Sequence, residues 1–489
     1  MNEQRDSQNG AHRAHDIEAA GGPGPLGDAG RAGGPDEQIT LRGPAELADC
    51  LPYLLGYHPS DSVVLVALHG ERGRFGGRVK LGIPGSPAEW EPTARQLAEC
   101  LIETSRRRDG RPDGIVLFLC REPVAGQTGR DVMQWLRPFA QRLRTACGTL
   151  DVPVFEALCI SGGRFWSYCC PDERCCPAEG AVLVAPGTSV LAAAATYAGV
   201  GLRGSQKQLE ARLEPISEPV SGGQRRALDD AGADLVRGML IGGRERREIG
   251  DDTIALAKML MDRLAAAERI TSPPSADAAD DRLIGDDEAA FVILGLQDRE
   301  TRDRAAAWME GPDAEPALRL WRALARRCVG PYIEHAAAPL TLAGWVAWST
   351  GDEPAARIAL AAALRSDAEY VFALLLHQAC NEGVEPEAIR KWLRRAGAEA
   401  RDRKAVDAGA ADETPAGETP GAGAPDAVEG PGGPARPRVR TVRPAGGRPA
   451  GRETAAGPGK QRRSAGTRGR AGGGAARSGG RTEDALGDA

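Results

Sequence analysis

Residues 62–70 read "SVVLVALHG", an apolar run with three valines that ends in a glycine. A short, β-branched run bounded by turn residues is typical of a strand buried on both faces. The next segment, "GRFGGRVKLGIP" (73–84), alternates polar and apolar residues. Because side chains of a strand point alternately to its two faces, this alternation predicts a second strand that pairs with the first as a hairpin.

Helical and strand patterns alternate on both sides of this hairpin. The further elements expected before residue 190 are helices over 44–56, 89–107 and 130–147, buried strands at "GIVLFLC" (114–120) and "VPVFEALCIS" (152–161), and a strand at "RFWSYC" (164–169). Buried strands that alternate with helices predict an α/β sandwich built on a mixed sheet.

The strand patterns stop after about residue 190. Residues 251–270 have helical spacing of apolar residues and an acidic start, and 286–396 read as helical throughout. Residues 342–370 resemble one tetratricopeptide unit, although its usual tyrosines and closing proline are missing. We therefore expect an all-α domain with a tetratricopeptide-like hairpin, in which the spacing of Trp345 and Trp348 indicates core packing.

Glycine and proline are concentrated at the two ends of the chain. The sequence holds 63 glycines and 35 prolines, and its C-terminal region adds many arginines to them. Such composition is typical of disordered segments. We predict a disordered leader (1–36), an α/β domain (37–200), a helical connector (201–285), an all-α domain (286–396) and a disordered low-complexity tail (397–489).

The bulk composition is that of a soluble protein. The chain has 489 residues, of which 27% are charged and 42% apolar, and its formal net charge is −6. Residues 1–35 lack an apolar stretch suited to a signal peptide, and Pro186 interrupts the most apolar window, 181–202. We expect cytoplasmic localisation without a membrane partner, and mostly free thiols among the 11 cysteines.

The segment "WSYCCPDERCCPAEG" (166–180) contains two pairs of adjacent cysteines, Cys169, Cys170, Cys175 and Cys176. Three interpretations are open. They could supply ligands to zinc, the one cofactor that the pattern suggests, although no second ligand pair follows. They could form a redox-responsive dithiol, because Arg174 lies between the pairs. The prolines after each pair favour the third interpretation, a tight turn whose thiols pack as small apolar groups.

The loop "LGYHPSDS" (55–62) is the second candidate site. His58, Asp61 and Ser62 offer a base, a carboxylate and a hydroxyl within five residues, and Arg78 or Lys80 is expected nearby. Residues this close on one turn rarely form a catalytic relay, and no nucleophile elbow or phosphate-loop motif is present in the sequence. The hypothesis of a ligand site here competes with a purely structural turn.

The stretches "LPYLLGYHPSDSVVLVAL" and "GRFWSYCCPDERCCPAEG" resemble the actinobacterial "domain of unknown function 4192" family. Members pair P-x-L-L-G-[FY]-x-P-x-[DE]-S-[LV]-V with W-x-S-Y-x-C…C-C-P-x-x-G about 100 residues later. The resemblance runs from about 37 to 396 and implies no particular activity. Lys80 stands where such sequences commonly carry an acidic residue, so a role for a carboxylate there is in doubt.

Two classes of function are consistent with these patterns. The first, which we favour, is a non-catalytic module that binds a protein partner or a small ligand. The alternative is a thiol- or zinc-dependent enzyme, which requires the loop 55–62 and the cysteine segment to meet in space. The Arg/Gly/Pro tail would attract nucleic acid only non-specifically, because it contains no aromatic residue that could stack on bases.

Overall fold

The computed structural model describes residues 18–20, 41, 43–174, 176–185, 187–199 and 201–395. The predicted tail and most of the predicted leader lie outside these ranges, so their disorder and the binding of nucleic acid by the tail stay predictions. None of the helices in these ranges combines the length and the hydropathy that a bilayer crossing requires.

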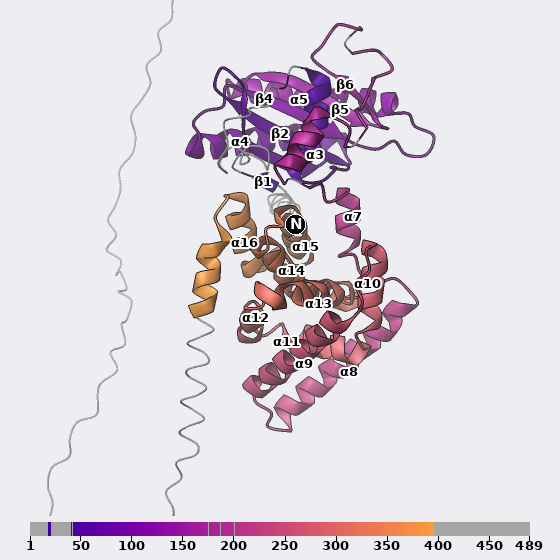
Figure 1. Ribbon diagram of the computed structural model, residues 1–489, viewed down its shortest axis with the longest axis vertical. Coiled ribbons are helices and arrows are strands. Elements are labelled where there is room, and N and C mark those ends of the chain that lie inside the picture. Colours follow the sequence, from indigo (N-terminus) through magenta and orange to yellow (C-terminus); the bar gives the residue numbers. More distant parts are fainter. Residues whose placement is uncertain are drawn as a thin grey trace, which may run out of the picture. The chain divides into compact units, whose positions relative to one another are not determined.

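A mixed sheet forms the first part of the fold, with strand order β1-β3-β2-β4-β5-β6-β7 (Figure 1). Its strands are β1 (Glu18–Ala20), β2 (Ser62–His69), β3 (Arg74–Gly82), β4 (Gly114–Cys120), β5 (Val154–Ser161), β6 (Arg164–Ser167) and β7 (Ala181–Val182). Strands β4 and β5 are parallel, and the other neighbouring pairs are antiparallel. The predicted mixed sheet is confirmed, and the short strands β1 and β7 are additions that the sequence patterns did not indicate.

Two helices cover one face of this sheet. They are α4 (Trp90–Arg108) and α5 (Gly129–Thr149), and α5 crosses over between the parallel strands β4 and β5. Val63 and Leu65 of β2 are fully buried in the core beneath them. Trp90 stacks on Phe139, with ring centroids 5.4 Å apart, and joins the two helices.

The opposite face of the sheet belongs to a second core. Val64 and Val66 of β2 point to this side, where α3 (Pro44–Leu55) and α6 (Val190–Tyr197) pack. The same buried cluster continues without a break into the later helices. The sheet therefore shares one of its two cores with the helical part of the chain, and the predicted domain boundaries stay predictions.

The chain after α6 is helical, as predicted. Its helices include α7 (Gln206–Ala211), α8 (Val220–Leu240), α9 (Arg246–Ala266), α10 (Pro273–Arg282), α11 (Asp286–Gly295), α12 (Arg299–Ala305), α13 (Ala314–Arg326), α14 (Ala337–Ser349), α15 (Glu353–Ser366) and α16 (Val371–Asn381), and residues 386–395 are helical as well. Helices α14 and α15 pack against each other as a hairpin. Its likeness to a tetratricopeptide unit stays a prediction.

Four tryptophans of the helical part lie in or against its core, whereas Trp392 is exposed. Trp345 is fully buried and donates a hydrogen bond from Nε1 to the carbonyl oxygen of Ala306 at 3.0 Å. Trp348 is buried beside it, and Trp308 stacks on the buried Trp321. The prediction that Trp345 and Trp348 pack in a core is confirmed.

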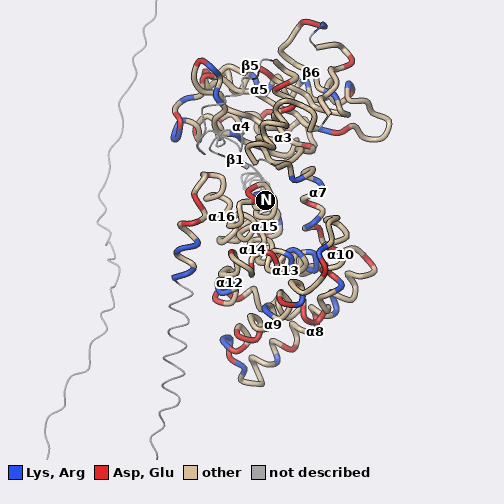
Figure 2. Tube along the Cα trace, in the orientation of Figure 1, with Lys and Arg blue, Asp and Glu red and all other residues tan. Residues whose placement is uncertain are grey.

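Arginines of α13 bind aspartates of α10 across the helical core. Arg319 pairs with Asp280 at 2.6 Å, and Arg326 pairs with Asp281 at 2.8 Å. Figure 2 shows blue and red positions side by side where these two helices meet. Each of these buried guanidinium groups therefore has a carboxylate to compensate the loss of hydration.

Candidate functional site

The predicted ligand loop pairs with the segment that leads into α7. The backbone N–H of Arg203 donates to the carbonyl oxygen of Gly56, and the N–H of His58 donates to Gly204, both at 2.9 Å. The N–H of Gln206 then donates back to His58, also at 2.9 Å. Three consecutive bonds of this kind make a short ladder between residues 56–58 and 203–206.

The polar side chains of the loop take part in the same contact. Ser62 donates from Oγ to the carbonyl oxygen of Ser60 at 2.6 Å and to Oε1 of Gln206 at 3.3 Å. Asp61 forms an ion pair with Lys207 at 2.8 Å. Within the described ranges, no hydrogen bond joins the ring of His58 to Asp61 or Ser62, and burial lowers the pKa of His58. The loop therefore holds α7 in place, and a ligand or catalytic role for its three side chains stays a prediction.

The first turn of α15 lies against both partners of this ladder. Gly56 adopts a φ of 83° at the end of α3, and a Cβ atom there would lie 2.4 Å from Cγ of Pro354. Arg203 forms an ion pair with Asp352, the N-cap of α15, at 3.5 Å. The loop, the connector before α7 and the start of α15 thus converge, and we call this region the junction.

Arg78 and Lys80 of β3 face the junction. Arg78 pairs in register with Val66 and Lys80 with Val64, which places both on the sheet face opposite α4 and α5. Only 9% of Arg78 and 5% of Lys80 are exposed. The ammonium group of Lys80 lies 5.6 Å from the ring centroid of Tyr57, a cation–π contact.

Arg78 is a buried cation without a hydrogen-bond acceptor in the described part of the chain. Burial is the main cause that lowers its pKa, to about 10, and the positive charge of Arg357 on α15 adds to it. Arg78 is therefore still protonated at neutral pH. Arg357, by contrast, donates hydrogen bonds to Glu353, to Asn381 and to the carbonyl oxygen of Cys380.

Several charged side chains meet at this position. Arg78, Lys80 and Arg357 bring three cations together with Glu353, and we call these four residues the junction cluster. Burial opposes ionisation of Glu353, but Arg357 and Arg78 outweigh it and lower its pKa, so the carboxylate is charged at neutral pH. Arg78 is the member of this cluster that has no hydrogen-bond acceptor within the described ranges, and its positive charge can attract an anion.

The cysteine segment forms a turn. The backbone N–H groups of Cys169 and Cys170 donate to Oγ of Ser167 at 3.0 and 2.8 Å. Arg174 is bonded to Asp172, and burial raises the pKa of the Cys169 thiol. The charge of Arg174 is thus engaged by a neighbouring carboxylate, and the redox-responsive dithiol stays a prediction.

The described ranges contain no group of three or more His, Cys, Asp or Glu side chains arranged to hold a metal ion. Cys169, Cys170 and Cys176 fall in these ranges and form no disulfide with another described residue, whereas Cys175 lies outside them. The side chain or backbone of Cys176 also interacts with another group of the chain. A zinc site that includes Cys175 stays a prediction.

The sheet separates the cysteine turn from the loop. Ser62 is in register with Cys120, Cys120 with Ile160, and Ile160 with Phe165 of β6, whereas Cys169 follows after the end of β6. Standard spacings give about 14 Å across the three strand intervals between Ser62 and Phe165, and β6 then runs farther away from Ser62 to its end at Ser167. The prediction that the two segments meet is wrong, because β6 runs antiparallel to β5 and carries the cysteines away from the start of β2.

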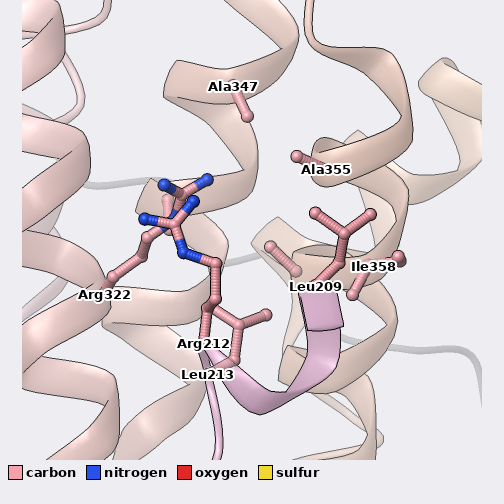
Figure 3. Close-up of a pocket in the computed structure, with 9 residues that line it drawn as sticks. Leu209, Arg212, Leu213, Arg322, Ala347, Ala355 and Ile358 are labelled. Carbon is pink, nitrogen blue, oxygen red and sulfur yellow. The ribbon is translucent and has the colours of Figure 1, made fainter. Parts of the chain in front are cut away.

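The sequence patterns missed a small cavity between α7 and helices α13, α14 and α15. Arg212 and Arg322 line it together with apolar side chains, and Figure 3 shows their guanidinium groups next to each other. No motif marks either residue, since both are single arginines in helical segments rich in arginine. Only the packing of segments more than 100 residues apart brings them together.

Comparison with known proteins identifies the family. The model of a family described as "Domain of unknown function (DUF4192)" matches residues 44–387, more than half of the chain. The chain belongs to the DUF4192 family. The resemblance noted from the sequence is thus confirmed, and the matched range includes the loop, β3 and α15. Neither the curated proteins nor the solved structures gave a match.

Proposed function

We propose that this DUF4192 protein is a non-catalytic binding module whose ligand is a small molecule with a carboxylate or phosphate group. The ligand's oxyanion would lie at the junction cluster, against Arg78. The observation that supports this proposal is Arg78, a residue that is nine-tenths buried and whose guanidinium has no hydrogen-bond acceptor in the described part of the chain.

The physical reason is the cost of burying an unpaired charge. A buried ion that lacks a partner costs several kcal/mol, which is why most buried arginines bind a carboxylate, as Arg319 and Arg326 do. The planar fork of a guanidinium matches carboxylate and phosphate groups, which it binds through two parallel hydrogen bonds. The ligand would supply the acceptor that Arg78 lacks.

A small ligand would reach this position more easily than the surface of a partner protein. Arg78 and Lys80 are too deeply buried for a flat protein surface to reach them. Binding requires only the charge and donors that the cluster has. The residues with catalytic potential in the sequence, His58, Asp61 and Ser62, support the binding proposal over the enzyme because Asp61 and Ser62 are engaged in holding α7.

The test is a calorimetric titration of the full chain with inorganic phosphate and with succinate. We expect at least one probe to bind, and Arg78→Met to weaken that binding by roughly tenfold or more, the effect of losing a charge-assisted pair. Arg74→Met is the matched control, because Arg74 lies on the same strand but is exposed. Equal affinity of the wild type and Arg78→Met, or no binding of either probe, would contradict the proposal.

A further inference from the structure

The cavity beside α7 contains a second arginine without an acceptor. Arg212 donates two hydrogen bonds to the carboxylate of Asp277, at 2.7 and 2.9 Å. Arg322 lines the same cavity, is mostly buried and has no hydrogen-bond acceptor within the described ranges. Burial is the main cause that lowers its pKa, to about 10, followed by the like charge of Arg212.

The charges around the cavity leave Arg322 uncompensated. Asp277 forms an ion pair with Arg212, and Asp352, the N-cap of α15, forms an ion pair with Arg203. Both carboxylates act on Arg322 through space without a hydrogen bond. A neutral water molecule would provide an acceptor but no charge. An anion would provide both, and it would also separate two guanidinium groups that repel each other.

The size of the cavity limits what can enter. Its volume is about 10 Å³, the scale of a single water-sized body. Leu209, Leu213 and Ile358 are among the apolar residues that line the rest of the cavity, and Figure 3 shows Leu209 and Ile358 across from the two guanidinium groups. Walls of this kind offer no donors to the outer atoms of a larger ligand, so a phosphate ester or a carboxylic acid does not fit.

We propose that Arg322 and Arg212 form a binding site for a small monoanion of the size of chloride. The anion would sit between the two guanidinium groups and join α7 to helices α13 and α15. Ile358 and Ala359 of α15 face this cavity, whereas Glu353 and Arg357 of the same helix face the junction cluster. The two sites are therefore separate, and this proposal does not depend on the first.

The test measures the melting temperature of the full chain as chloride replaces a bulky anion, that of the MOPS buffer, at constant ionic strength. For each tenfold increase in chloride above its dissociation constant, we expect a rise of roughly 2–4 °C, because an anion that binds only the folded state stabilises it. Arg322→Met should abolish this dependence. Arg299→Met, in which an exposed arginine is changed, should retain it.

Two results would overturn the proposal: a melting temperature of the wild type that does not depend on chloride, or an equal dependence in Arg322→Met. If Arg322→Met does not fold, crystals of the wild type grown in bromide decide. An anomalous peak between the guanidinium groups of Arg212 and Arg322 supports the anion site. The electron density of a water molecule, without an anomalous signal, overturns it.

Discussion

At the scale of single residues, the arginines of the helical part divide into those with a carboxylate and those without. Arg263 belongs to the first kind and donates to both oxygens of Glu288, at 2.8 and 2.9 Å. The sequence does not show this division. Arg326, for example, takes its partners from segments 45 and 114 residues away. Sequence patterns named Arg78 as a ligand residue but could not show that it lacks an acceptor.

The pair of Arg263 and Glu288 gives a prediction about acid stability. Arg263 is the main cause that lowers the pKa of Glu288 below its usual 4.5. The pair therefore stabilises the fold fully above the pKa that Glu288 has in the unfolded chain. This stabilisation is lost as the pH falls through the lower pKa that Glu288 has in the folded chain. We predict that Glu288→Gln costs about 1–2 kcal/mol at neutral pH, the worth of a charged hydrogen bond.

The measurement is the free energy of unfolding in urea between neutral pH and pH 3. Below pH 4.5 the wild type should lose stability more steeply than Glu288→Gln, so that the two curves approach each other. Glu71→Gln, at an exposed residue, is the control and should follow the wild type. Parallel curves for Glu288→Gln and the wild type would show that the pair does not stabilise the fold.

At the scale of elements, the strands could be predicted because each is marked by a short apolar run within its own sequence. The run "SVVLVALHG" became β2, and the hairpin with β3 formed as expected. The burial of Arg78 and Lys80 on β3 could not be predicted, because the second face of the sheet is covered partly by helices that follow much later in the chain. Alternation indicates two faces, but it does not show that both are buried.

The contact between the end of α3 and the start of α15 gives a prediction at this scale. Gly56→Ala adds a Cβ that would lie 2.4 Å from Pro354 and imposes a left-handed backbone on alanine. We expect a loss of roughly 2–4 kcal/mol, of which about 1–2 kcal/mol is the backbone term. Gly70→Ala is the control, because Gly70 has a φ of 75° and open space around its Cβ position.

Urea unfolding of both variants measures the difference. Hydrogen exchange of residues 203–206 shows whether the ladder opens, and its amides should lose protection in Gly56→Ala but keep it in Gly70→Ala. An equal loss of stability in the two variants, with unchanged protection of 203–206, would mean that the contact with Pro354 contributes nothing.

At the scale of the whole molecule, the sheet and the helices share one hydrophobic core. The sequence predicted an α/β part followed by helices, and this order is confirmed. It did not show that the helices would close the second face of the sheet, nor that the loop and the cysteine turn would lie apart. Both depend on strand register and on long-range packing, which a local pattern does not encode.

The central claim is that the acceptor missing from Arg78 is the oxyanion of a ligand. The most direct test is the free energy of unfolding of the wild type and Arg78→Met as a function of inorganic phosphate, at constant chloride. Without phosphate, we predict that Arg78→Met is at least as stable as the wild type, because an unpaired buried charge is removed. Added phosphate should stabilise the wild type alone. A variant that is several kcal/mol less stable at every phosphate concentration, beside a wild type that does not respond, would contradict the claim.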